Sequence, residues 1–211
     1  MNSAFYESFN YWIQGGILLV PIALVGFLIF FYFLRLNERL KESLIIKPGL
    51  EDEIEDKLNR GEPLSEKLGE SNGFFSGIVD YVSNGLSRGV GLAELFTEVW
   101  QQTFPPLRRD LVILAALISA APLLGLLGTV WGMIQTFQVL ALKTGGSSGL
   151  MAAGISQALI TTQFGLVVAL PGIFGVSRLR RKLQELEVRV TSLQMHFSLG
   201  LRNNPIYYKS D

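Results

Sequence analysis

Residues 111–142 read LVILAALISAAPLLGLLGTVWGMIQTFQVLAL, an uncharged run of 32 residues between Asp110 and Lys143. A helix rises 1.5 Å per residue, so about 20 apolar residues suffice to cross the roughly 30 Å hydrocarbon core of a bilayer. This run is longer, and we expect a helix that is tilted or that projects beyond the membrane. The alternative, a soluble protein, requires a small chain to surround a helix that is apolar on all sides. The run therefore predicts a membrane span.

Two further uncharged runs, residues 15–34 and 149–177, are also long enough to span a bilayer. Trp12 flanks the first run, as interfacial aromatic residues do, and Pro21 lies inside it, where a kink is tolerable in lipid. The first basic residue, Arg35, follows this run, so we expect a retained anchor and not a cleaved signal peptide. The three runs predict an all-α integral membrane protein with three transmembrane helices.

The composition argues against several classes of function. The formal net charge is zero, so there is no basic excess to attract nucleic acid. The chain has no cysteine, which excludes disulfides, thiolate metal sites and cysteine nucleophiles. The single histidine, His196, has no metal-type partner near it in sequence, and we assign it a structural or surface role. No nucleophile–base pair or carboxylate dyad is evident, so we expect neither an enzyme nor a cofactor.

Basic residues gather at one end of each run, and their excess marks the cytoplasmic side of a membrane protein. The basic residues that carry this assignment are Arg35, Arg39, Lys41, Arg108, Arg109, Arg178, Arg180, Arg181 and Lys182, against only Lys143 on the other side. The predicted organisation is a periplasmic N-terminus (1–14), transmembrane helices at 15–34, 111–142 and 149–177, a cytoplasmic helical region at 35–110, a periplasmic loop at 143–148, and a cytoplasmic C-terminal helix and tail at 178–211.

The region between the first two runs shows helical patterns. The acidic run from Glu51 predicts a helix start with a solvated face, because acids favour the N-terminal end of the helix dipole. Residues 91–104 also predict a helix, and Pro105-Pro106 should kink or briefly interrupt it. Its apolar side carries Leu92, Leu95, Phe96 and Val99.

After the third run, apolar residues recur at alternating steps of four and three, the a/d spacing of a packed helix seam. This pattern predicts that the third span continues as one long helix into the cytoplasm. The seam consists of Leu179, Leu183, Leu186, Val190, Leu193 and Phe197.

None of the three runs contains Asp, Glu, Lys, Arg or His, so this chain cannot supply a titrating group from inside the membrane. The runs carry hydroxyls and amides instead. In the second run Gly125, Thr129, Gly132 and Thr136 share one helical face, and in the third Gly154, Ala158, Thr162, Gly165 and Ala169 do the same. Such faces suit either close packing of small residues, with threonines bonding their own helix backbone, or the lining of a pore.

The segment Gly145-Gly146-Ser147-Ser148-Gly149 lacks the Gly-Lys-Ser/Thr ending of a phosphate-binding loop. We interpret it as a flexible outer turn between the second and third runs.

Two motifs in the spans resemble those of a known family. Residues 121–137 (APLLGLLGTVWGMIQTF) and 154–166 (GISQALITTQFGL), the latter followed by Ala169-Leu170-Pro171, resemble the second and third spans of the MotA/TolQ/ExbB proton-channel family. The resemblance is most specific over residues 115–177, and the predicted three-span layout extends it to nearly the whole chain. It is nearer to ExbB and TolQ than to MotA, which has four spans.

The resemblance implies a homo-pentamer around a central pore in the bacterial inner membrane. The pore would hold the transmembrane helices of two copies of an ExbD/TolR-like single-span partner, whose membrane Asp takes and releases protons. The motion would be passed to a TonB- or TolA-like protein. On this basis the matching pore threonines would be Thr129 and Thr162. The other polar groups of the spans add Thr136, Thr161 and Gln157 as pore-lining candidates, and the small residues give the helix-packing candidates Gly125, Gly128, Gly132, Gly154, Ala158 and Gly165.

One position departs from the family. ExbB and TolQ commonly have Glu just before the Ala-Leu of the third span, where this chain has Gln157, so a carboxylate role there is lost. The leading hypothesis is an ExbB-like energiser of outer-membrane transport. A TolQ-like role in envelope integrity and division, a non-conducting membrane scaffold, and sodium in place of proton coupling stay open as alternatives.

Overall fold

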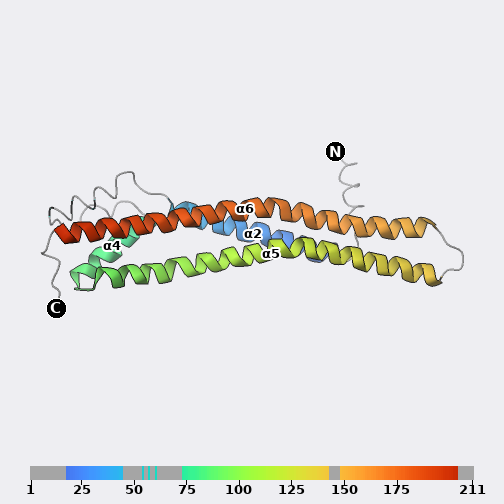
Figure 1. Ribbon diagram of the computed structural model, residues 1–211, viewed down its shortest axis with the longest axis horizontal. Helices are drawn as coiled ribbons and strands as arrows, with labels where there is room; N and C mark the ends of the chain where they lie inside the picture. Colours follow the sequence, from blue (N-terminus) through green and yellow to red (C-terminus); the bar gives the residue numbers. More distant parts are fainter. Residues whose placement is uncertain are drawn as a thin grey trace. The chain divides into compact units, whose positions relative to one another are not determined.

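The computed structural model describes residues 18–44, 54, 57, 60, 73–142 and 148–203, in which all regular structure is helical. Four helices follow one another in the chain (Figure 1): α2 (Leu19–Ser43), α4 (Phe74–Ser87), α5 (Leu92–Leu142) and α6 (Ser148–Asn203). The chain forms two compact units. We call Met1–Leu34 with Val112–Ser177 the span unit, and Arg35–Leu111 with Arg178–Asp211 the charged unit.

Several predicted features lie outside the described residues. They are the N-terminal segment 1–14, the start of the first run, nearly all of the acidic region from Glu51, and residues 143–147 of the predicted loop. The prediction that Ser148 and Gly149 belong to a flexible turn is wrong, because α6 begins at Ser148.

In the span unit, one stripe of α2 faces inward with the alternating three- and four-residue spacing of a packed helix. Leu19, Ile22 and Ile29 of this stripe are at most 6% exposed. A Cβ added at Gly26, on the same stripe, would lie 3.3 Å from the side chain of Val168 in α6. The helix α2 therefore packs closely against α6.

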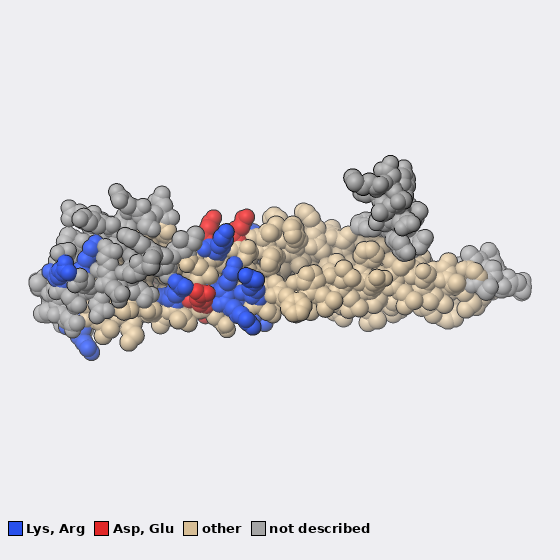
Figure 2. Space-filling model, turned by 90° about the horizontal axis from the view of Figure 1, so that it is seen from above, with Lys and Arg blue, Asp and Glu red and all other residues tan. Residues whose placement is uncertain are grey.

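The outward surface of the span unit is mostly apolar. Among the described residues 25 large apolar side chains are exposed, and 22 of them belong to this unit, with Phe174 at 75% and Phe27 at 66%. Its described residues include no charged side chain and no histidine, and the space-filling view shows a broad surface without Lys, Arg, Asp or Glu (Figure 2). A surface of this kind is stable against lipid and not against water.

Three helices among the described residues, α2, α5 and α6, are long and apolar enough to cross a membrane, as predicted. At 51 and 56 residues, α5 and α6 are roughly 77 Å and 84 Å long, far more than the bilayer core requires. The third run does continue without a break as one long helix to Asn203.

The prolines behave differently from the sequence-based expectation. The predicted interruption at Pro105-Pro106 is wrong, because α5 runs through both residues. Both prolines are exposed, whereas Phe104 and Leu107 beside them are buried. The apolar contacts of these two neighbours keep the helix continuous, and solvent can reach the side of the helix that carries the prolines. Pro21 lies in the first turn of α2, where a missing N–H costs no helical hydrogen bond.

The charged unit is built on the predicted seam of α6. All six seam residues are at most 5% exposed, and the ring of Phe197 meets the edge of Phe96 from α5 at a centroid distance of 5.9 Å. Leu95 and Val99 are buried beside Phe96, as the pattern of residues 91–104 predicts. A hydrophobic core therefore joins α5 and α6 in this unit.

Charged side chains link the helices at the surface of the charged unit. Arg108 of α5 donates from Nε and Nη2 to Glu187 Oε1 of α6, at 3.0 and 2.7 Å. Lys182 Nζ donates to Asn37 Oδ1 of α2 at 2.8 Å. Partly exposed pairs of this kind contribute little free energy, so we regard them as fixing the register of the helices.

The helix α4 joins this unit through its apolar face and ends at Ser87, and Gly89 just beyond its end has a φ of +84° that allows the chain to turn into α5. On its outer side, the Tyr81 hydroxyl donates to Glu98 of α5. This hydrogen bond to the Glu98 carboxylate raises the pKa of Tyr81 above its ordinary value.

Phe197→Ala should destabilise the charged unit by about 3–5 kcal/mol, because it removes a fully buried ring from the seam. The measurement is the free energy of unfolding of the detergent-solubilised protein. Val188→Ala is the matched control on the same helix, since Val188 is 68% exposed, and it should change the free energy by no more than about 0.5 kcal/mol. Equal effects of the two substitutions would show that the seam is not the core.

Candidate functional site

The helices α5 and α6 approach each other backbone to backbone in the span unit. A Cβ added at Gly165 would lie 2.7 Å from the carbonyl oxygen of Ala121 and 3.2 Å from Cα of Gly125. A Cβ added at Gly132 would lie 3.0 Å from that of Ala158. Contact at these distances leaves room only for small residues. The structure also sets Gly128 against Thr161, and Gly154 against Thr136.

The contact divides the surface of α5 into two flanks. Gly125 and Gly132 lie on the line of contact with α6. Because successive residues are turned by about 100°, Gly128 and Thr129 fall about 50° to either side of this line. Gly128 and Thr129 are therefore on opposite flanks.

The same geometry applies to α6. Ala158 and Gly165 lie on the line of contact, and Thr161 and Thr162 fall about 50° to either side of it. Thr161 faces Gly128, so these two share one flank. It follows that Thr162 shares the other flank with Thr129, and we call this the threonine flank.

The hydrogen bonds on the threonine flank determine what it can bind. The Thr162 hydroxyl donates to the carbonyl oxygen of Gly125 at 2.9 Å, and that of Thr129 donates to Leu126 at 2.7 Å. A hydroxyl has one proton and two lone pairs, so each oxygen has only lone pairs left. The flank can therefore accept a hydrogen bond from water or a protonated carboxylic acid, or coordinate a cation. In this arrangement it cannot donate to a carboxylate.

The other two candidate threonines are occupied within the contact. Thr161 is 2% exposed and Thr136 8% exposed. Their hydroxyls donate to backbone carbonyls of their own helices, Thr161 to Ala158 at 2.7 Å and Thr136 to Gly132 at 2.8 Å. This is the local bonding expected of threonines that serve helix packing.

Gln157 lies on the flank opposite the threonine flank. It lines a cleft of about 180 Å³ together with Thr161, Gly128 and Gln135. Grouping residues by type placed Gln157 with Thr129 and Thr162, whereas the structure separates them. Gln135 was not among the predicted site residues, although an amide in an apolar span is a signal of its own.

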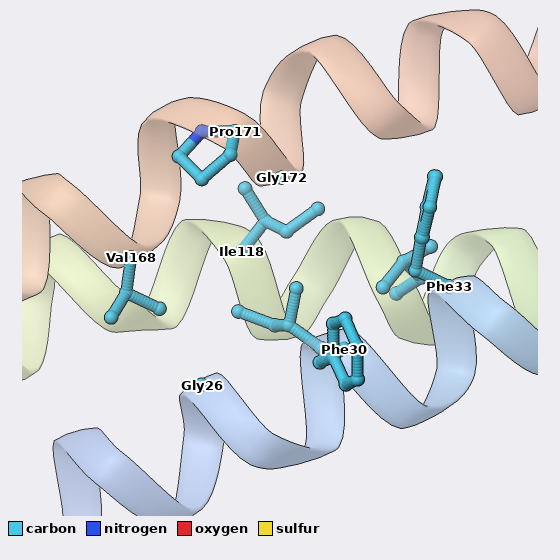
Figure 3. Close-up of a pocket in the computed structure, with 9 residues that line it drawn as sticks. Gly26, Phe30, Phe33, Ile118, Val168, Pro171 and Gly172 are labelled. Atoms are coloured by element: carbon cyan, nitrogen blue, oxygen red, sulfur yellow. The ribbon is translucent and has the colours of Figure 1, made fainter.

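A second, larger cavity of about 380 Å³ lies among α2, α5 and α6. Figure 3 shows Phe30 and Phe33 of α2, Ile118 of α5 and Pro171 of α6 around it. All nine lining residues are apolar, so no side chain there can hold or pass a proton. Among the described residues, no three metal-ligating side chains come together either.

These features define a helical membrane protein with uncharged polar groups placed inside its spans. The chain matches the MotA/TolQ/ExbB proton channel family over residues 74–192, more than half of its length, and it belongs to that family. The resemblance noted in the span motifs is thereby confirmed.

Individual relatives carry both ExbB and TolQ names. An ExbB-like biopolymer transport protein of Synechocystis sp. is 50% identical over 70 residues, 32% of this chain and 28% of that protein. The Tol-Pal system protein TolQ of Haemophilus influenzae is 36% identical over 74 residues, 35% of this chain and 32% of that protein. The matched segments thus span about a third of these relatives. An ExbB-like protein of Helicobacter pylori is 34% identical over 105 residues, 49% of this chain and 68% of that protein.

Gly165→Ala should lower the melting temperature of the detergent-solubilised protein. Replacing glycine by alanine inside a helix normally stabilises it by about 1 kcal/mol. At Gly165 the new methyl group would meet backbone atoms of α5, and overpacking of this kind costs about 1–3 kcal/mol. Gly77→Ala is the control: it lies inside α4 with no atom within 4 Å of an added Cβ, so it should not lower the melting temperature. A rise for both variants would contradict the close contact.

Proposed function

We propose that this chain is the channel subunit of an inner-membrane motor that uses the proton motive force to energise outer-membrane transport through a TonB-like protein. It would act with an ExbD/TolR-like single-span partner that supplies the titrating Asp. One observation carries this proposal: the described residues of the span unit contain no Asp, Glu, Lys, Arg or His, yet they present two hydroxyl oxygens as lone-pair acceptors on one flank.

The acceptor character of the threonine flank fits a partner carboxyl group. An ionised carboxylate is costly in a dry pore, whereas a protonated one can donate a hydrogen bond. Thr129 and Thr162 would accept that hydrogen bond and so favour the neutral form of the acid next to them. The carboxyl would lose its proton only after leaving the threonines for water. This coupling of position to protonation is what an ion-driven motor needs.

The threonine flank also supports assembly into a ring. Thr129 and Thr162 are half-buried in a single chain, and one α5–α6 pair cannot enclose a pore. Polar groups in a membrane span face protein or water and not lipid. A homo-pentamer with this flank turned inward would satisfy that requirement, and five copies would place a layer of ten threonines around the partner helices.

The proposed orientation follows from the basic residues that flank the spans. It places residues 35–110 and 178–211 in the cytoplasm, and the N-terminus and the loop at 143–148 in the periplasm.

Specific observations support two alternatives to this proposed function. Relatives named TolQ match about as much of this chain as the ExbB-like relative of Synechocystis sp. does, which supports a TolQ-like role in envelope integrity and division, with the same ion channel and another partner protein. Hydroxyl oxygens with free lone pairs also coordinate sodium, so sodium coupling is the second alternative. A non-conducting scaffold, the third hypothesis, gives the lone-pair acceptors no role.

The test is ion flux in proteoliposomes, for this protein alone and with its co-purified single-span partner. Thr162→Val should reduce partner-dependent proton flux at least tenfold, because it removes the acceptor oxygen while keeping the side-chain shape. Thr162→Ser keeps the oxygen and should retain most of the flux. Thr191→Val is the matched control on the same helix, since Thr191 is exposed in the charged unit and bonds only its own backbone at 2.9 Å.

Assembly of each variant with the partner is checked by co-purification, because Thr162→Val also removes the hydrogen bond to Gly125. Proton flux without the partner would contradict an external carboxylate. Flux that follows a sodium gradient and not a pH gradient would favour sodium coupling. An intact complex that conducts neither ion would favour the scaffold.

A further inference from the structure

The cleft on the flank opposite the threonines is unlike its surroundings. It is formed by α5 and α6 with Leu18, and it exposes the amides of Gln135 and Gln157 beside Trp131. In the part of the chain that the structure describes, neither amide has a hydrogen-bonding partner. Thr161, also in the cleft wall, already donates to its own helix. The exposed Gln135 and the half-buried Gln157 therefore line one small cleft with two amides that have no partner among the described residues.

The chemistry of the two glutamines restricts what fills this space. Each amide has two N–H donors and an acceptor oxygen, and lipid chains can satisfy none of them. An ion would meet no opposite charge among the described residues of the span unit. Water can both donate and accept, and about 180 Å³ has room for several molecules at roughly 30 Å³ each. The apolar cavity of Figure 3 has no such groups and can stay dry.

The position of the cleft along the helices shows which end of the span unit is nearer to it. Gln135 lies seven residues before the end of α5 at Leu142, about 10 Å along the helix. Gln157 lies nine residues after the start of α6 at Ser148, about 14 Å along it. The cleft is therefore near the end of the span unit where residues 143–147 connect the two helices.

The inner wall of the cleft is close to the threonine flank. The Thr161 hydroxyl lies 3.4 Å from the carbonyl oxygen of Gly125, and the Thr162 hydroxyl donates to the same oxygen at 2.9 Å from the other side. A single backbone carbonyl thus separates the cleft from the proposed pore surface.

We propose that this cleft is a water-filled vestibule, which opens on the side of the 143–147 connection and reaches inward to Thr161. The presence of water follows from the two amides alone. The role of the vestibule would be to bring water from the side of the 143–147 connection to the level of Thr129 and Thr162. This role rests on the proposed channel function.

Single cysteines test the vestibule directly, because the chain has no cysteine of its own. Gln135→Cys and Gln157→Cys are made separately, reconstituted with the partner, and treated with a membrane-impermeant methanethiosulfonate reagent. Such reagents attack the thiolate, which forms in contact with water. Leu159→Cys is the matched control: it is two residues from Gln157, at nearly the same depth, and 63% exposed on the apolar surface. The two glutamine positions should react at least tenfold faster than the control.

Two results would overturn the proposal. Equally slow reaction at all three positions would mean that the cleft is dry. Rapid reaction of the glutamine positions only when the partner is absent would mean that protein, and not water, fills it. Co-purification with the partner establishes that each variant is folded, and two independent positions guard against a local packing defect. Rapid reaction in a complex that conducts no ion would support the vestibule and contradict the channel, so the two proposals fail separately.

Discussion

The backbone contact between α5 and α6 is the constraint on which the arrangement of the span unit depends. A Cβ at Gly165 would strike the carbonyl of Ala121, so the two helices are as close as glycine allows. At this distance the residues beside the line of contact are forced to one flank or the other. Thr129 and Thr162 thereby come together on one side, and Gln157 faces the cleft on the opposite side.

The bilayer gives this division its chemical meaning. Lipid cannot solvate polar groups, and the span unit presents mostly apolar side chains outward while it buries Thr136 and Thr161 at the α5–α6 contact. Thr129 and Thr162 have given their protons to backbone carbonyls and keep acceptor oxygens, whereas the amides of Gln135 and Gln157 keep both donors and acceptors. The two threonines can therefore bind a neutral acid or a cation, and the two glutamines can bind water. Neither pair titrates, which is why the proposed channel takes its carboxylate from another chain.

Much of the fold could be predicted from local patterns. The three uncharged runs correspond to α2, α5 and α6, and the spacing of the seam from Leu179 to Phe197 correctly predicted its burial. The predicted break at Pro105-Pro106 failed, because buried neighbours hold α5 together and both prolines are on its exposed side. Local proline rules cannot foresee that compensation, since it depends on which side of the helix is packed.

The sequence by itself determined the class of protein, the positions of the spans and the absence of charge within them, because hydrophobicity and helical period are properties of neighbouring residues. It also indicated the small residues through which α5 and α6 meet. Only the tertiary structure decided which polar residues act together. Thr161 and Thr162 are adjacent in sequence, yet a turn of about 100° sends one to the cleft and the other to the threonine flank. Thr161 and Thr162 are on opposite flanks only because α5 packs against α6 along a line that runs between them.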